Sequence, residues 1–154
     1  MMMVTSYDYS VLYKVFSRLL KNELTLTMID LNGNGRPPEP PFVAFDIINP
    51  KIPNNYLEDD RVFEAVVSFT IYSKNKLEAM NLCNQVRATL RTTSADVIYA
   101  KNGISLVETM AIEPRFVTET NNYAYMYGFD ARLRLVEVES TPDIEITEIK
   151  IKEN

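Results

Sequence analysis

Two long segments of this chain alternate between apolar and polar side chains, and this pattern constrains the fold more than any other sequence feature. In residues 61–72 every second residue is apolar, namely Phe63, Ala65, Val67, Phe69 and Ile71. Residues 123–138 repeat the pattern with Tyr125, Tyr127, Phe129, Ala131, Leu133 and Leu135. A period of two is that of a β-strand with one buried face. The sequence therefore predicts a sheet, mostly antiparallel, with one face against a core.

Two other segments have the period of a helix. Residues 8–21 place their apolar side chains on one stripe: Leu12, Val15, Phe16, Leu19 and Leu20. The residues after Ser73 form a second stripe: Ala79, Leu82, Cys83, Val86 and Leu90. Ser6 and Ser73 are candidate N-caps for the two helices. At 154 residues the chain has the length of one domain. We therefore expect a single α+β domain with two main helices packed on one face of the sheet.

Two polar connections and a short strand separate these elements. Residues 30–41 hold two glycines and four prolines, so neither a helix nor a central strand is expected there. Residues 42–48 predict a short strand that ends at Asn49-Pro50, and residues 49–60 predict a long loop. Loops of that length in a compact domain are usually functional or disordered. The loop supplies the first candidate interface residues: Asn54, Asn55, Tyr56, Leu57, Glu58, Asp59 and Asp60.

The end of the chain supplies the second set of candidate interface residues. Residues 144–151 alternate, but the apolar phase changes after the second isoleucine; the four isoleucines are Ile144, Ile146, Ile149 and Ile151. A strand with a bulge explains this pattern, and so does an arm that pairs with the sheet edge of a neighbouring molecule. We accordingly divide the chain into a domain of residues 1–140 and a C-terminal strand or interaction arm of residues 141–154.

The composition excludes several kinds of chemistry. The chain has no histidine and one cysteine, so it can form neither an internal disulfide nor the usual zinc sites, Ser-His-Asp triads or Cys-His pairs. Cys83 lies on the apolar stripe of the second helix, which favours a core residue over a reactive thiol. A net charge of −5 argues against a broad nucleic-acid footprint. We predict no catalytic residue, no metal and no cofactor.

Three charged motifs suggest chemistry that their spacing does not support. Residues 30–35 resemble the opening of a calcium loop, but Pro41 stands where the loop needs its bidentate glutamate. Asp143 and Glu148 are similar to part of a metal-dependent nuclease signature, yet on one extended strand they would lie about 16 Å apart. Arg132 and Arg134 are candidates for phosphate binding, although cross-strand pairing with Glu64 or a similar residue is the preferred interpretation.

In chain order, the sequence resembles the tail terminator, or neck terminator, family of tailed bacteriophages over about residues 8–138. The segments that carry the resemblance follow the N-terminal helix: PPFVAFDIINP, then RVFEAVVSFTIYSKNKLEAMNLCNQVRATL, and finally NYAYMYGFDARLRLVEV. The resemblance implies a sheet with helices on one face and a ring of subunits, usually six, on the last layer of the tail tube. Such a ring ends tube polymerisation and offers a docking surface to the head.

The same resemblance implies the partners. They are further copies of this chain, the tail tube protein and the head-tail connector protein, with the tail sheath protein as an additional candidate. DNA would only pass through the lumen. The expected location is the virion, at the junction of tail and head, after assembly in the host cytoplasm. No membrane association is expected, because the longest apolar runs fall far short of the roughly 20 residues that a span needs.

Three other interpretations stay open. The first is a connector or completion protein on the head side of the same junction. The second is a metal-dependent enzyme that uses Asp and Glu alone, and the third is a host-side binding module with no place in a particle.

Overall fold

The computed structural model describes residues 4–31, 33, 35–57, 61–115 and 125–140. Its main sheet has six strands, and five of them follow the order β2-β3-β4-β7-β5. Their bounds are β2 Met28–Asp30, β3 Phe42–Pro53, β4 Val62–Ser73, β7 Tyr125–Val136 and β5 Ile104–Thr109. The sixth strand, β6 (Glu113–Pro114), also pairs with β7. Only the β2–β3 pair is parallel. The predicted α+β class with a mostly antiparallel sheet is confirmed.

The two alternating segments lie side by side at the centre of the sheet. β4 and β7 pair over their whole length, with Phe69 opposite Phe129 and Ala65 opposite Leu133. This register aligns the two apolar faces, because side chains of paired residues point to the same side. The rings of Phe69 and Phe129 stack with centroids 5.4 Å apart.

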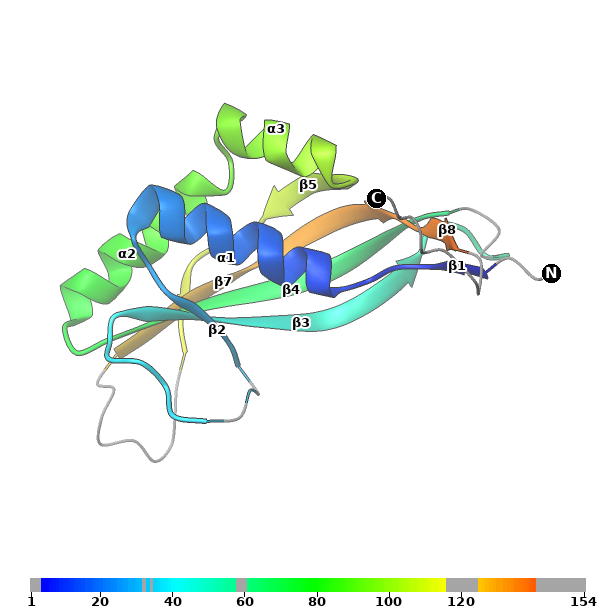
Figure 1. Cartoon of the computed structure of the whole chain (residues 1–154). Coiled ribbons are helices and arrows are strands. Elements are labelled where there is room, and N and C mark those ends of the chain that lie inside the picture. The colour runs from blue at the N-terminus through cyan, green and yellow to red at the C-terminus, as the bar shows by residue number, and fades with distance from the viewer. Residues whose placement is uncertain (1–3, 32, 34, 58–60, 116–124, 141–154) are drawn as a thin grey trace.

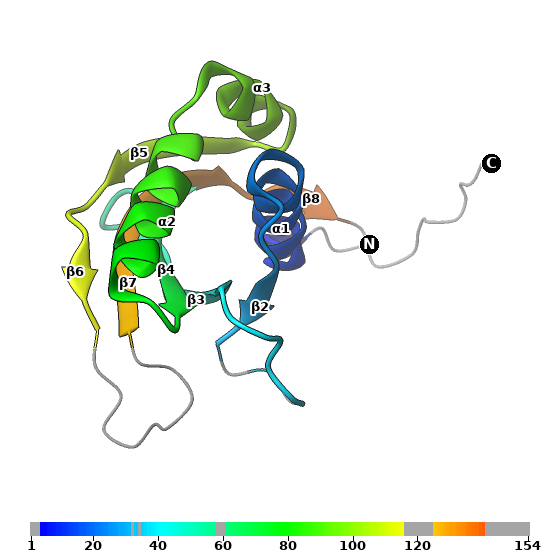
Figure 2. The same cartoon turned by 90° about the vertical axis from the view of Figure 1, so that its left-hand side faces the viewer.

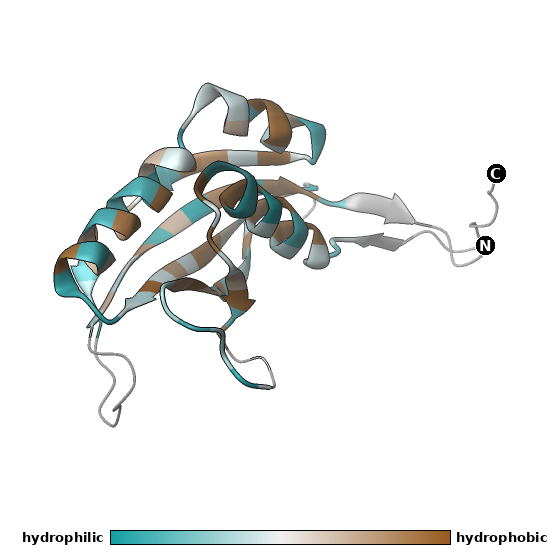
Figure 3. Ribbon diagram, turned by 60° about the vertical axis from the view of Figure 1, so that its left-hand side comes forward, coloured by the Kyte–Doolittle hydropathy of each residue, from teal (hydrophilic) through white to brown (hydrophobic). Residues whose placement is uncertain are grey.

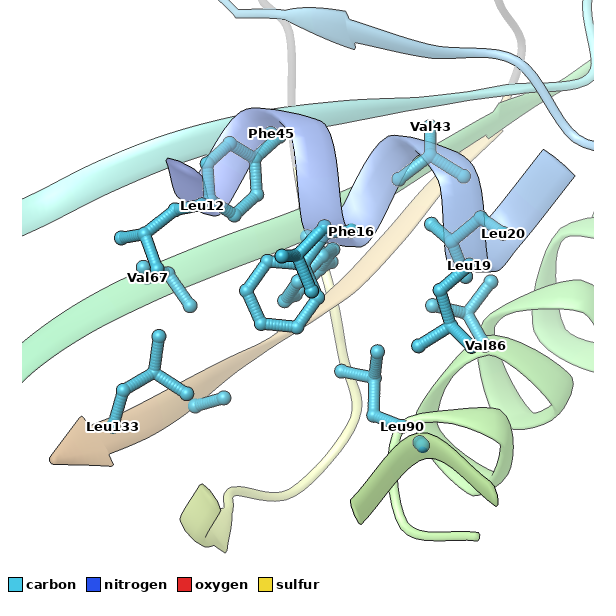
Figure 4. Close-up of a cluster of buried hydrophobic side chains, with 14 of the residues drawn as sticks. Leu12, Phe16, Leu19, Leu20, Val43, Phe45, Val67, Val86, Leu90 and Leu133 are labelled. Atoms are coloured by element: carbon cyan, nitrogen blue, oxygen red, sulfur yellow. The ribbon is translucent and has the colours of Figure 1, made fainter. Parts of the chain in front are cut away.

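The helices cover this apolar face. α1 (Ser10–Leu24) and α2 (Lys76–Thr89) lie on the same side of the sheet, which curves around them (Figure 2). Figure 3 shows brown, hydrophobic positions along both the helices and the central strands. Phe16 of α1 is fully buried beside Phe45 (Figure 4). Its ring also contacts those of Phe69 and Tyr99. The core thus forms between the two predicted helices and the central strands.

A third helix and two short strands complete the fold. α3 (Thr93–Lys101) packs beside β5, and its Tyr99 donates a hydrogen bond to the carbonyl oxygen of Leu90 at 2.8 Å. β1 (Val4–Ser6) and β8 (Val138–Ser140) pair with each other in a separate sheet. This pair lies at the end of the molecule opposite α2 (Figure 1). It brings the N-terminal strand beside the end of the predicted domain at residue 140.

Several predicted boundaries were wrong. β3 continues past Asn49-Pro50 to Pro53, because register shifts after Ile47 and after Asn49 absorb the residues that cannot pair regularly. Residues 49–53 are therefore strand, and the connection that follows is shorter than predicted. Asp30 belongs to β2 and not to a loop. The pair Asn121-Asn122 also predicts a turn that joins residues 115–118 and 123–138 in a hairpin. That turn lies outside the described residues, and before it the backbone N–H of Arg115 donates to the carbonyl oxygen of Met126 at 2.8 Å.

Both predicted helix caps were also wrong. α1 begins after Tyr9, and Asp8 accepts a hydrogen bond from the backbone N–H of Ser10, so Ser6 lies outside the helix in β1. α2 is capped by Asn75, whose side chain accepts from the N–H of Glu78 at 3.0 Å. Ser73 is instead buried at the end of β4, where it donates to the carboxylate of Glu78. An asparagine one turn ahead of the stripe serves as well as a serine.

Candidate assembly surfaces

The tip of the β3–β4 hairpin exposes apolar side chains. Tyr56 is 96% exposed and Leu57 is 74% exposed, the two largest exposed fractions among the large hydrophobic side chains of the described residues. Asn54 and Asn55 beside them are also exposed. An exposed apolar group on a loop held by a rigid scaffold is typical of a contact surface. The other predicted residues of this loop, Glu58, Asp59 and Asp60, lie outside the described residues.

The base of this hairpin is fixed to the rest of the domain. Tyr9 donates a hydrogen bond to the carbonyl of Pro50 at 2.7 Å, and Lys51 forms an ion pair with Glu137 at 2.6 Å. The ring of Tyr7 packs edge-on against Phe63 with centroids 5.7 Å apart. Burial raises the pKa of Tyr7 to about 12. These contacts hold the strands beneath Tyr56 and Leu57 in place.

The sheet face opposite the helices carries polar side chains around Arg115. Its guanidinium donates to the hydroxyls of Ser68 and Thr70. It also forms ion pairs with Asp130 at 2.9 Å and with Glu113 at 3.3 Å. The Arg115 side chain is only 20% exposed although it lies on the side of the sheet that the helices leave open. These bonds make Arg115 a fixed cross-link between β4, β6 and β7.

Gly128 creates the space for this arrangement. A Cβ atom at this position would lie 2.5 Å from the carbonyl oxygen of Phe69, 2.9 Å from Oγ1 of Thr70 and 3.0 Å from Nε of Arg115. The first neighbour is backbone and cannot move aside alone. A glycine inside a strand often marks such a close approach.

A second charged row continues along the same face. Glu64 pairs with Arg134 at 3.1 Å and with Arg132 at 3.6 Å, and Arg132 also lies 3.7 Å from Glu108. The preferred interpretation of these arginines, cross-strand pairing with Glu64, is confirmed. With 41% and 51% of their side chains exposed, Arg132 and Arg134 remain accessible to a partner.

The β5 strand has a cavity of about 350 Å³ beside it. The cavity is lined by Arg87 near the end of α2, by Arg91 between α2 and α3, by Asp96 of α3, and by Leu106, Val107, Glu108 and Thr109 of β5. Arg87 donates to the carbonyl oxygens of Thr109 at 3.0 Å and Met110 at 2.8 Å. The register between β5 and β7 shifts at Val107, whose side chain is 41% exposed.

The described residues bear little sign of reaction chemistry. Cys83 is fully buried, and burial raises its thiol pKa to about 12, as expected for a core residue. No group of three or more His, Cys, Asp or Glu side chains is arranged to hold a metal ion in the described ranges. No helix of that part combines the length and apolar character needed to cross a bilayer.

Sequence reasoning and structure overlap only partly at these surfaces. Of the predicted interface residues, the structure places Asn54, Asn55, Tyr56 and Leu57 together at one tip. The predicted arm residues Ile144, Ile146, Ile149 and Ile151 lie outside the described residues. Sequence reasoning missed Arg115 and the β5 edge. The Gly128 residue inside an otherwise bulky strand was the one signal that could have pointed to a close approach there.

The fold and these surfaces define a small α+β protein with several candidate contact surfaces. The sequence profile of the family described as phage neck terminator protein matches residues 10–154. The chain belongs to this family, which gives it a structural role in the neck of a bacteriophage, at the junction of tail and head. No match was found among curated proteins.

Proposed function

We propose that this protein forms a ring, with six copies as the expected number, on the head-proximal end of the tail tube. The ring ends tube polymerisation and provides the docking surface for the head-tail connector protein. The observation that carries the proposal is the family match over residues 10–154. The exposed pair Tyr56 and Leu57 on a braced hairpin supplies a surface suited to docking.

The physics of a closed ring fits a domain of this kind. In a ring each subunit uses two different patches, so that one patch contacts the complementary patch of the next copy. The hairpin tip is one candidate surface, and the charged sheet face and the β5 edge, which share Glu108, form another. A terminator must also contact the tube protein on one side and the connector on the other. An acidic chain with a net charge of −5 suits a lumen through which DNA slides, because like charges repel. We place the acidic loop of residues 54–60 toward the lumen or toward the neighbouring ring.

A connector on the head side of the junction is the rival function within the same particle. Electron microscopy of particles assembled without this protein separates the two. Loss of a terminator leaves tails of abnormal length, or tails that do not join heads. Loss of a head-side connector leaves free tails of normal length and heads that leak DNA, and this outcome would refute the proposal.

Residue-level support comes from the hairpin tip. Tyr56→Ser with Leu57→Ser should leave the fold intact, because both side chains are exposed. It should reduce the fraction of tails that join heads in a complementation assay. Leu77→Ser is the matched control, since Leu77 is 62% exposed on α2, at the opposite end of the molecule (Figure 1).

A further inference from the structure

The outer edge of β5 is open to another strand. Within the described ranges β5 ends the strand order of the main sheet and pairs with β7 on one side only. The open edge of a strand presents unpaired backbone N–H and C=O groups, which makes it a template for pairing with another chain. Figure 2 shows β5 at the margin of the sheet, with α3 beside it.

Only part of the β5 edge is free to pair with another strand. Arg87 already occupies the carbonyl oxygens of Thr109 and Met110 at the end of the strand. The part that remains is Ile104 to Glu108, about 17 Å of extended backbone. Alongside it lies the cavity of about 350 Å³, with exposed Val107 on its rim. The charged side chains that line this cavity are two basic and two acidic ones: Arg87, Arg91, Asp96 and Glu108.

One segment of the chain is long enough to cover this edge and has the alternating pattern of a strand. Residues 144–151 are eight residues long and carry four isoleucines in two alternating pairs. The charged residues within this segment are Glu145, Glu148 and Lys150. The isoleucines suit contact with Leu106 and Val107. We propose that β5 of one protomer accepts residues 144–151 of a neighbouring copy as an added antiparallel strand.

The geometry favours a neighbour over the same chain. β8 continues from β7, and β5 runs antiparallel to β7. A segment that reversed after Ser140 and returned along its own β5 would run parallel to it. The arm of another copy is free to run antiparallel, which continues the pattern of β4, β7 and β5 and gives slightly more stable pairing. An arm on one subunit and an open edge on the next also form the two unlike patches of a ring.

This inference rests on the proposed ring, and a cross-linking experiment tests it separately. Full-length Val107→Cys chains carrying an affinity tag are co-expressed with untagged Ile146→Cys chains and treated with a short bis-maleimide. Cys83 is fully buried and does not compete in the folded protein. Covalent dimers of one tagged and one untagged chain are expected. Leu77→Cys, at an exposed site on α2, replaces Val107→Cys in the control and should give none.

Two outcomes would overturn the assignment. One is a ring that forms without tagged-untagged dimers above the Leu77→Cys control. The other is a double variant, Val107→Cys with Ile146→Cys, that links only within single chains.

A charge variant gives an independent readout. Val107→Lys places an ammonium group on the open edge, a device that blocks strand addition. The ring species should be lost in light scattering while the monomer stays folded. Val97→Lys on α3, where the side chain is 51% exposed, is the matched control and should keep the ring. Rings in both variants would refute the β5 assignment and leave the proposed function standing. If wild-type chains form no ring in solution or in particles, the proposed function itself fails.

Discussion

The Gly128→Ala substitution tests the packing around Arg115, because the sign of the change in the free energy of unfolding shows whether a methyl group fits there. Replacing glycine by alanine in a strand usually stabilises a protein by about 0.4–1 kcal/mol, because the unfolded chain loses freedom. Positive φ angles occur at Gly35 and Gly103 but not at Gly128, so backbone conformation alone would permit the alanine. The structure predicts the opposite result for steric reasons.

The magnitude follows from the neighbours of the added methyl group. It would lie 2.5 Å from the Phe69 carbonyl oxygen and 3.0 Å from Nε of Arg115. Overpacking of this kind costs about 1–3 kcal/mol. Displacing the guanidinium from Ser68, Thr70 and Asp130 weakens charged hydrogen bonds and adds about 1 kcal/mol. We therefore expect the free energy of unfolding to fall by about 2–4 kcal/mol.

Urea denaturation measures this difference. With an m-value of about 2 kcal/mol per M, the midpoint should fall by roughly 1–2 M. The measurement is repeated at several protein concentrations, because assembly stabilises the folded state. The double variant Gly128→Ala with Arg115→Ala should lose less than the sum of the single variants, since both substitutions disturb the same contacts. A stabilised Gly128→Ala variant, or strict additivity, would refute the reasoning.

Three further results are expected. Phe16→Ala should lower the free energy of unfolding by about 3–5 kcal/mol in urea denaturation, because its fully buried ring contacts three others, whereas Tyr56→Ala should change it by less than about 0.5 kcal/mol. In a pH series of thermal melts, stability should decline as the pH rises from about 9 toward 12. Burial raises the pKa values of the Cys83 thiol and the Tyr7 hydroxyl from 9.0 and 10.0 to about 12, so the unfolded chain releases these protons at lower pH than the folded chain. A flat profile would contradict the burial of these two groups. Deleting residues 141–154 should leave a folded monomer by circular dichroism but impair ring formation by light scattering, and normal rings would exclude the arm.

The central part of the fold could be predicted because two periods dominate the sequence. The alternation in residues 61–72 and 123–138 identified the paired strands β4 and β7, and the stripes identified α1 and α2. These signals are strong because each element buries one complete face against the core. Cys83 was correctly assigned to the core for the same reason.

The predictions failed where tertiary contacts override local signals. Asn49-Pro50 reads as the end of a strand, yet β3 continues because the pairing with β4 shifts its register there. β2 has only three residues and forms by parallel pairing with β3, so no period could show it. Gly128 of β7 pairs with Thr70 of β4, and its missing side chain leaves the space in which Arg115 lies. No spacing in the sequence reveals this pairing.

Cryo-electron microscopy of the neck in intact virions tests the central claim most directly. A reconstruction without imposed symmetry at the junction should place copies of this domain in a closed ring on the last layer of the tail tube, between the tube and the connector. Density for the domain on the head side of the connector would contradict the account, and so would its absence from the particle.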